Sequence, residues 1–167
     1  PAAVALHSVG HGNVQIGDTV AVFGAGPIGI MLALWSKTAG AAKVILCDID
    51  QTKVDFAKSL GFTAVNSREN DPVAFIKEET GGRGADVCIE GAGVSQTFEQ
   101  ALKSAKADGH VVCMGNPAGD MTLTQNGYWE ILRKQLTVRG TWNSSYNGEK
   151  NDWKTALHAI ATHQVDV

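Results

Sequence analysis

Three glycines stand within six positions of the stretch AVFGAGPIGI, residues 21–30, and their spacing is G-x-G-x-x-G. Gly24 permits a tight turn, Gly26 lets another group approach the backbone closely, and Gly29 lets a helix pack against a strand. A helix that begins at such a turn presents free N–H groups and a partial positive charge to an anion. The spacing therefore predicts a site for the pyrophosphate of a dinucleotide, with purely structural glycines as the alternative.

Two residues that follow refine this prediction. Pro27 has no N–H group to donate, but its fixed φ suits the first turn of a helix. Ile28 is therefore the first residue of that helix with an N–H group to offer. We expect this group to be the main donor to the pyrophosphate.

An acidic residue, Asp48, ends the next apolar run, KVILCD at 43–48. A carboxylate at this point accepts hydrogen bonds from both ribose hydroxyls of an adenosine and repels a 2′-phosphate, which has a charge of the same sign. The nearest cation that follows is Lys53, and no arginine lies close. The pattern predicts NAD rather than NADP, with Ile49 and Lys53 beside the cofactor. Asp50 competes for the ribose, but its position suits a helix cap better.

Two later loops, EGAGVS at 90–95 and MGNPAG at 114–119, follow apolar runs typical of strands. Ligands of open parallel sheets lie at the carboxyl ends of the strands. We expect the first loop to pass beneath the adenosine or its ribose and the second to face the nicotinamide, with ordinary turns as the alternative. The residues concerned are Gly91, Ala92, Gly93, Met114 and Gly115.

The end of the last apolar run contributes Thr141 and Trp142 to the same set. A tryptophan there could form a wall of the nicotinamide pocket or fill the core, and the sequence leaves both open. Glu90 ends a strand near the expected crevice, where a hydrogen-bonding role is favoured over catalysis.

Histidines and cysteines give weaker signals. His7 and His11 are four residues apart, a spacing that could place both on one helix face and bind a metal. Gly10 and Gly12 indicate that this helix ends there, so we assign no metal ligand.

The three cysteines lie far apart in strand-like runs and read as small buried hydrophobic residues of a reduced compartment: Cys47, Cys88 and Cys113.

Composition sets the remaining bounds. The chain has 167 residues, of which 44% are hydrophobic and 19% charged, and its net charge is −3. These values fit one globular domain. Lysine and arginine are scattered, which argues against a nucleic-acid or membrane surface. No signal peptide or membrane span is recognisable, so we expect a cytoplasmic protein.

The elements that must position these residues alternate between strand and helix. We expect a doubly wound α/β fold with a six-stranded parallel sheet and helices on both faces. The expected strands are 18–24, 43–48, 63–66, 86–90, 110–115 and 136–142, with an extended piece at 121–124. The expected helices are 2–9, 27–40, 51–60, 71–80, 95–107, 128–134 and 152–163.

The sequence resembles a known family over essentially its whole length, 1–167. GAGPIG, CDID with Lys53, and ILRKQLTVRGTW are the most specific parts. They resemble the cofactor-binding Rossmann domain of zinc-type medium-chain alcohol dehydrogenases, and within that family the sorbitol and galactitol-1-phosphate dehydrogenases.

The resemblance implies oxidation of an alcohol or polyol, with hydride transfer to NAD and a zinc ion that polarises the substrate. In this family the zinc ligands lie in an N-terminal catalytic domain, which this chain lacks, so the chain alone should bind cofactor without turnover and no catalytic residue is assigned. The resemblance also implies a homodimer or homotetramer formed through a sheet edge near Met121–Thr124 and Leu136–Trp142.

Two other functional classes share the glycine pattern. A regulatory NAD-binding module would have the glycines and the acidic residue, but not ILRKQLTVRGTW. A methyltransferase would bind S-adenosylmethionine and would not need a pyrophosphate at Gly26.

Overall fold

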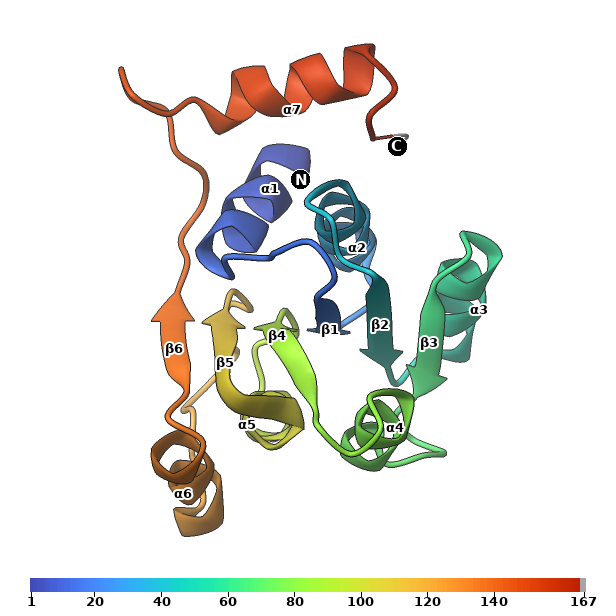
Figure 1. Cartoon of the computed structure of the whole chain (residues 1–167), viewed down its shortest axis with the longest axis vertical. Coiled ribbons are helices and arrows are strands. Elements are labelled where there is room, and N and C mark those ends of the chain that lie inside the picture. Colours follow the sequence, from blue (N-terminus) through green and yellow to red (C-terminus); the bar gives the residue numbers. More distant parts are fainter. Residues whose placement is uncertain (166–167) are drawn as a thin grey trace.

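A computed structural model describes residues 1–165 of the chain. Its centre is a six-stranded sheet in the order β3-β2-β1-β4-β5-β6 (Figure 1). Every neighbouring pair is parallel. The strands are β1 (Thr19–Phe23), β2 (Lys43–Asp48), β3 (Thr63–Asn66), β4 (Ala85–Glu90), β5 (Ala105–Cys113) and β6 (Thr137–Gly140). The expected doubly wound sheet is confirmed, and the chain reverses its direction of winding between β1 and β4.

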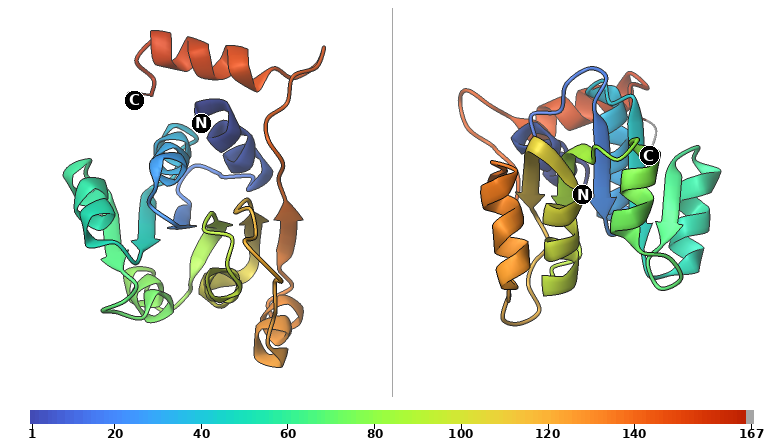
Figure 2. Two further views of the ribbon diagram at one scale, coloured as in Figure 1. Left: turned by 180° about the vertical axis from the view of Figure 1, so that it is seen from behind. Right: turned by 60° about the horizontal axis from the view of Figure 1, so that its bottom comes forward.

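Helices connect the strands and cover both faces of the sheet, as the two sides of Figure 1 and the views of Figure 2 show. The helices are α1 (Ala2–His11), α2 (Pro27–Thr38), α3 (Gln51–Ser59), α4 (Pro72–Glu79), α5 (Ser95–Ser104), α6 (Gln125–Arg133) and α7 (Asp152–Ala161). Helix α7 crosses over α1, and the two helices pack together.

The alternation of side chains along each strand produces two cores. In β1, Val20 and Val22 belong to the core under α1, α2 and α3, while Ala21 and Phe23 belong to the core under α4 and α5. Both sets are essentially inaccessible to solvent. A strand buried on both faces explains the continuous apolar runs in the sequence.

Helix caps fix where several elements begin. Asp50 caps α3 by accepting a hydrogen bond from the Thr52 N–H at 2.9 Å, which confirms the capping role expected of it. Asp71 caps α4 in the same way through Val73. Pro27 occupies the first turn of α2, as the sequence predicts.

The boundary between α5 and β5 differs from the expectation. The helix ends at Ser104 rather than 107, and the strand begins at Ala105 rather than 110. Ala105 pairs with Ala85 across the sheet, and the register then shifts before Val87 meets His110. The first residues of this strand, Ala105, Lys106 and Ala107, favour a helix, so tertiary pairing overrides the local preference.

The piece at 121–124 is not a strand. Its backbone and hydroxyl groups bind α5 instead: the Thr122 N–H donates to Ser95 Oγ at 2.9 Å, and the Thr124 hydroxyl donates to Glu99 at 2.8 Å. Within residues 1–165, no helix is long and apolar enough to cross a membrane.

Candidate functional site

The glycine-rich turn between β1 and α2 has the backbone geometry that its sequence predicts. Gly24 has φ +110°, a value that favours glycine. A Cβ atom on Gly29 would lie 2.0 Å from the Gly24 carbonyl oxygen. The first glycine therefore makes the turn, and the third lets α2 pack directly against that turn.

The second glycine differs because nothing in the protein explains it. Gly26 has φ −68°, which any residue adopts, and a Cβ atom built on it would meet no protein atom within 4 Å. Gly26 is also the N-cap of α2, and no side chain caps this helix. The first turn of α2, which includes the Ile28 N–H, is thus left without a side-chain acceptor.

Asp48 lies beside this turn at the end of β2. One carboxylate oxygen accepts a hydrogen bond from the Ala25 N–H at 2.7 Å, and the other accepts from the Asp50 N–H at 2.9 Å. The side chain is 8% exposed, and the Lys53 ammonium lies 3.9 Å from it. Asp48 therefore stabilises the glycine turn through the Ala25 N–H. The two hydrogen bonds also fix the carboxylate in position, with lone pairs left to accept further hydrogen bonds.

The loop after β4 has a different arrangement. Glu90 is buried, and its Oε1 atom accepts hydrogen bonds from the N–H groups of Ala92 and Gly93, each at 2.8 Å. The Thr97 hydroxyl donates to the same oxygen at 2.7 Å. The hydrogen-bonding role expected of Glu90 is confirmed.

The loops after β4 and β5 touch backbone to backbone. A Cβ atom on Gly93 would lie 2.2 Å from the Asn116 carbonyl oxygen, and one on Gly115 would lie 2.2 Å from the Gly93 nitrogen. The Glu90 carbonyl oxygen also accepts from the N–H groups of Met114 and Gly115, each at 2.9 Å. Only residues without side chains fit at this crossing.

Two cavities flank the start of α2, each of about 310 Å³. The first lies over the ends of β1, β2 and β3; among the predicted residues, its lining includes Gly24, Asp48, Ile49 and Ala92. The second lies over the ends of β4, β5 and β6; its lining includes Ile28, Gly91, Met114, Gly115, Thr141 and Trp142. Ten of the fifteen predicted residues thus line these two cavities, which together make up the crevice at the carboxyl edge of the sheet.

Five predicted residues line neither cavity. Gly29 and Gly93 lie at the backbone crossings described above, where they shape the crevice. Pro27 and Lys53 line an apolar groove between α2 and α3 together with Gly26. Trp142 is 78% exposed, so the reading in which it fills the core is wrong and the reading as a cavity wall remains.

Sequence reasoning missed several residues of the crevice. Ser67 follows β3, and the rule that strand ends share one edge could have found it. Val4 comes from α1, which precedes the sheet, and no sequence signal indicates its place. The remaining cavity residues outside the predicted set are Phe23, Cys47, Val94, Gln96, Thr97, Gln100, Asn116 and Asn143.

The paired histidines lie away from the crevice, on α1. His7 Nε2 lies 2.9 Å from His11 Nε2, and His7 Nδ1 lies 2.8 Å from the buried carboxylate of Asp152 at the start of α7. Burial, followed by the charge of Arg139, lowers the pKa of His11. No group of three or more potential metal ligands occurs in the described part of the chain. The histidines join α1 to α7.

The cysteines are free thiols. Cys47 and Cys88 are buried, as expected, whereas Cys113 is partly exposed. Burial, and then the negative charge of Glu90, raise the pKa of Cys113 to about 11. These thiols are therefore protonated at neutral pH and packed as hydrophobic groups.

Comparison with known proteins places the crevice in a family context. The zinc-binding dehydrogenase family profile matches residues 27–162. Sorbitol dehydrogenase of Bacillus subtilis is 34% identical over 119 residues, which cover 71% of this chain and 34% of that protein.

Solved structures agree with this match. Galactitol-1-phosphate dehydrogenase of Escherichia coli superposes with a TM-score of 0.88 and 30% identity, covering 99% of this chain and 49% of the other. A Sinorhizobium meliloti 1021 protein, classed as a zinc-binding dehydrogenase and solved with NADP bound, gives a TM-score of 0.88 and 31% identity over 100% of this chain and 48% of its own. The chain spans about half the length of the curated relatives that it matches end to end.

Proposed function

The chain belongs to the zinc-binding dehydrogenase family, and from this premise we propose that it is the NAD-binding domain of an alcohol or polyol dehydrogenase. The observation that carries the proposal is the open cradle at Gly26. A glycine whose Cβ would meet nothing in the protein, at an uncapped helix start, leaves room for a ligand that approaches the backbone. An anion is the group that such a start binds best.

The crevice divides between the parts of a dinucleotide. The pyrophosphate lies at Gly26 and accepts from the Ile28 N–H, between the two cavities. The adenosine occupies the cavity beside Asp48 and Ile49, and the nicotinamide occupies the cavity beside Met114 and Trp142. The extents of these cavities, one on each side of the helix start, support this division.

Asp48 makes NAD the preferred cofactor over NADP. Its carboxylate is held by two backbone N–H groups, so it stays in place to accept hydrogen bonds from the ribose hydroxyls. A 2′-phosphate there would meet a fixed negative charge. One family member was solved with NADP bound, so membership of the family does not by itself determine the cofactor. The preference for NAD over NADP is inferred from Asp48 and is tested separately.

The bound nicotinamide supplies the hydride acceptor, and the chain's own residues bind and orient it. The ligands of a catalytic zinc would lie outside this chain, in the part of a longer enzyme that its relatives also contain. We expect residues 1–167 alone to bind cofactor without oxidising an alcohol. The free cysteines support a reducing, cytoplasmic location.

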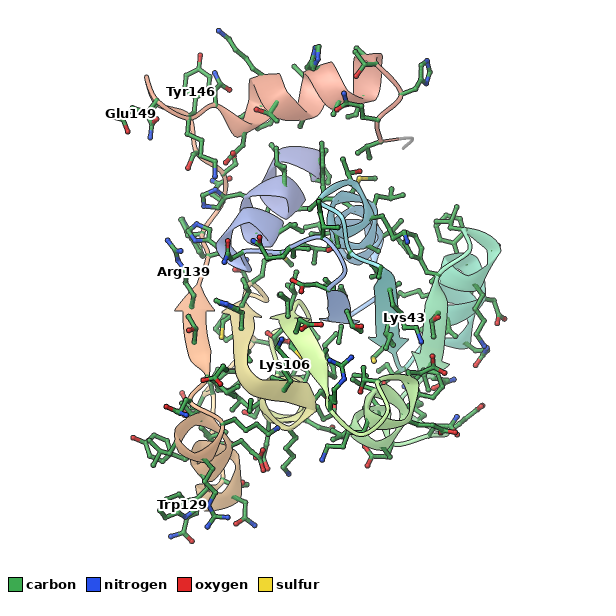
Figure 3. The ribbon with its side chains drawn as sticks, viewed as in Figure 1. Lys43, Lys106, Trp129, Arg139, Tyr146 and Glu149 are labelled. Carbon is green, nitrogen blue, oxygen red and sulfur yellow. The ribbon has the colours of Figure 1, made fainter. Side chains whose placement is uncertain are left out.

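A second copy of the chain is the partner that we propose for the open sheet edge. Strand β6 pairs only with β5 among the described strands, and all four of its residues are exposed. Arg139 lies on this strand, and Trp129 lies on the neighbouring α6 (Figure 3). Exposed edge strands are usually covered, so Leu136–Trp142 is the segment expected to pair in a dimer, with Met121–Thr124 near it.

Calorimetric titration of the chain with NADH, NADPH and S-adenosylmethionine tests the proposal. We expect NADH to bind, NADPH to bind at least about tenfold more weakly, and S-adenosylmethionine not to bind. Binding of S-adenosylmethionine alone would contradict the function, while equal affinities for NADH and NADPH would contradict only the role of Asp48.

A further inference from the structure

Glu90 is a buried charged group for which the protein provides no opposite charge. The residue is 2% exposed. Seven ion pairs join side chains within residues 1–165, and Glu90 takes part in none of them. Buried carboxylates are normally paired with a cation or coordinate a metal, because isolation from water is costly.

The hydrogen bonds of this carboxylate are unevenly divided. Oε1 accepts all three that the side chain receives, from Ala92, Gly93 and Thr97. No described residue donates to Oε2. The fully enclosed side-chain atoms without a partner are His11 Nδ1 and Ser104 Oγ, so Oε2 keeps some contact with solvent. One oxygen therefore anchors the loop, and the other is left available.

The unpartnered oxygen lies beside Gly115, a residue that lines the second cavity. A Cβ atom on Gly115 would be 2.8 Å from Oε2. Gly115 lines that cavity together with Gly91 and Met114. The charge of Glu90 is also felt nearby, since it contributes to the raised pKa of Cys113.

We propose that Glu90 is the countercharge for the oxidised nicotinamide ring, and that it favours binding of NAD⁺ over NADH. This inference rests on the proposed function, in which the second cavity holds the nicotinamide. The ring carries a positive charge in NAD⁺ and none in NADH. A fixed carboxylate beside Gly115 therefore attracts the oxidised form selectively. An uncharged group in the same place would not distinguish the two forms by charge. The adenosine and pyrophosphate are the same in both forms and cancel in the comparison.

The test compares the dissociation constants of NAD⁺, NADH and ADP-ribose for the whole chain and its Glu90→Gln variant. Glutamine keeps the shape of the side chain and an oxygen for the loop N–H groups, but removes the charge. We expect the preference for NAD⁺ relative to NADH to fall on the order of 10-fold, the size of a Coulomb interaction across a partly screened interior. ADP-ribose, which lacks the ring, should change by less than about twofold.

Asp152→Asn is the matched control, since it removes another buried carboxylate, 1% exposed, on the far side of α1. Its ratio of NAD⁺ to NADH affinity should equal that of the unmodified chain. Equal losses of all three ligands in Glu90→Gln would show that Glu90 only supports the loop, and would overturn the proposal.

Glu90→Asp provides a second variant if Glu90→Gln does not fold. It keeps the charge but draws it back from Gly115 by one methylene, so the ratio should move in the same direction by about twofold. An unchanged ratio in that variant would also overturn the proposal. Failure of the unmodified chain to bind NADH would instead contradict the proposed function, so the two failures are distinguishable.

Discussion

The loops after β1 and β4 are both rich in glycine and follow neighbouring strands, but their backbone N–H groups bind different partners. In the β4 loop, the N–H groups of Ala92 and Gly93 bind the carboxylate of Glu90. In the β1 loop, the N-terminus of α2 has no capping side chain, and Gly26 faces open space. In the β1 loop Asp48 likewise accepts from the Ala25 N–H, and α5 likewise begins without a side-chain cap, so the two loops differ at Gly26, where a Cβ would meet no protein atom within 4 Å.

This contrast separates the loop that we propose for the pyrophosphate from a loop that is closed by other parts of the protein. Glycines alone do not distinguish the two loops, since both sit at the carboxyl edge of a parallel sheet. The difference lies in the space beside the backbone: a Cβ on Gly26 would meet no protein atom within 4 Å, whereas one on Gly93 would lie 2.2 Å from the Asn116 carbonyl oxygen. We therefore expect equivalent substitutions in the two loops to have different consequences.

The largest expected effect is that of Ile28→Pro in the β1 loop. Removing this N–H should weaken NADH binding at least about 100-fold, because charge-assisted hydrogen bonds to a phosphate are strong and the ring crowds the approach. Fluorescence titration measures the affinity, and circular dichroism checks the fold. Trp153→Pro at the second position of α7 is the control, and NADH affinity in that variant should be unchanged. Full NADH affinity in Ile28→Pro would remove the assigned donor.

Gly93→Ala tests the β4 loop. Its φ is +73° and the new Cβ would lie 2.2 Å from the Asn116 carbonyl oxygen, so the two loops must separate. We expect the free energy of unfolding in urea to fall by about 2–4 kcal/mol. Gly119→Ala is the control, because its Cβ meets nothing within 4 Å. A stability equal to that of the unmodified chain would show that the loops are not packed as described.

Asp48→Asn tests the residue that links the β1 loop to the cavity proposed for the adenosine. An amide still accepts one hydrogen bond from the Ala25 N–H, but the charge is lost. We expect NADH affinity to fall about tenfold and the discrimination against NADPH to weaken by a similar factor. Asp50→Asn, which removes a neighbouring charge while keeping the cap of α3, should retain the discrimination. Loss of discrimination in both variants would point to general charge rather than to Asp48.

The smallest expected effect is on the pH dependence of stability and concerns His11. This residue lies outside both loops, so its effect should be independent of the difference between them. Its pKa lies below the ordinary value of 6.5, because burial and then Arg139 disfavour the charged form. The unfolded chain therefore takes up a proton before the folded chain does, so stability falls as pH drops below about 6.5 and levels off below the folded pKa. His11→Gln should lose this part of the pH dependence in urea unfolding, whereas His158→Gln should keep it. An unchanged profile in His11→Gln would contradict the direction of the shift.

The sequence predicts the sheet and the glycine turn well because each depends on local rules. Apolar runs indicate strands buried on both faces, and Gly24 and Gly29 are needed by the backbone itself. The role of Asp48 as a support for the turn and the closeness of Glu90 Oε2 to Gly115 depend on contacts between residues that are far apart in the sequence. The early start of β5 has the same origin, since the pairing of Ala105 with Ala85 overrides a helical composition.

The sharpest test of dinucleotide binding at the start of α2 is Gly26→Ala, with NADH affinity and the free energy of unfolding both measured. The backbone at Gly26 suits alanine, and the new methyl group meets no protein atom within 4 Å. The account predicts unchanged or slightly higher stability, together with at least about 100-fold weaker NADH binding, because the methyl group occupies the place of the pyrophosphate. NADH affinity equal to that of the unmodified chain would contradict the claim that the α2 start binds the dinucleotide.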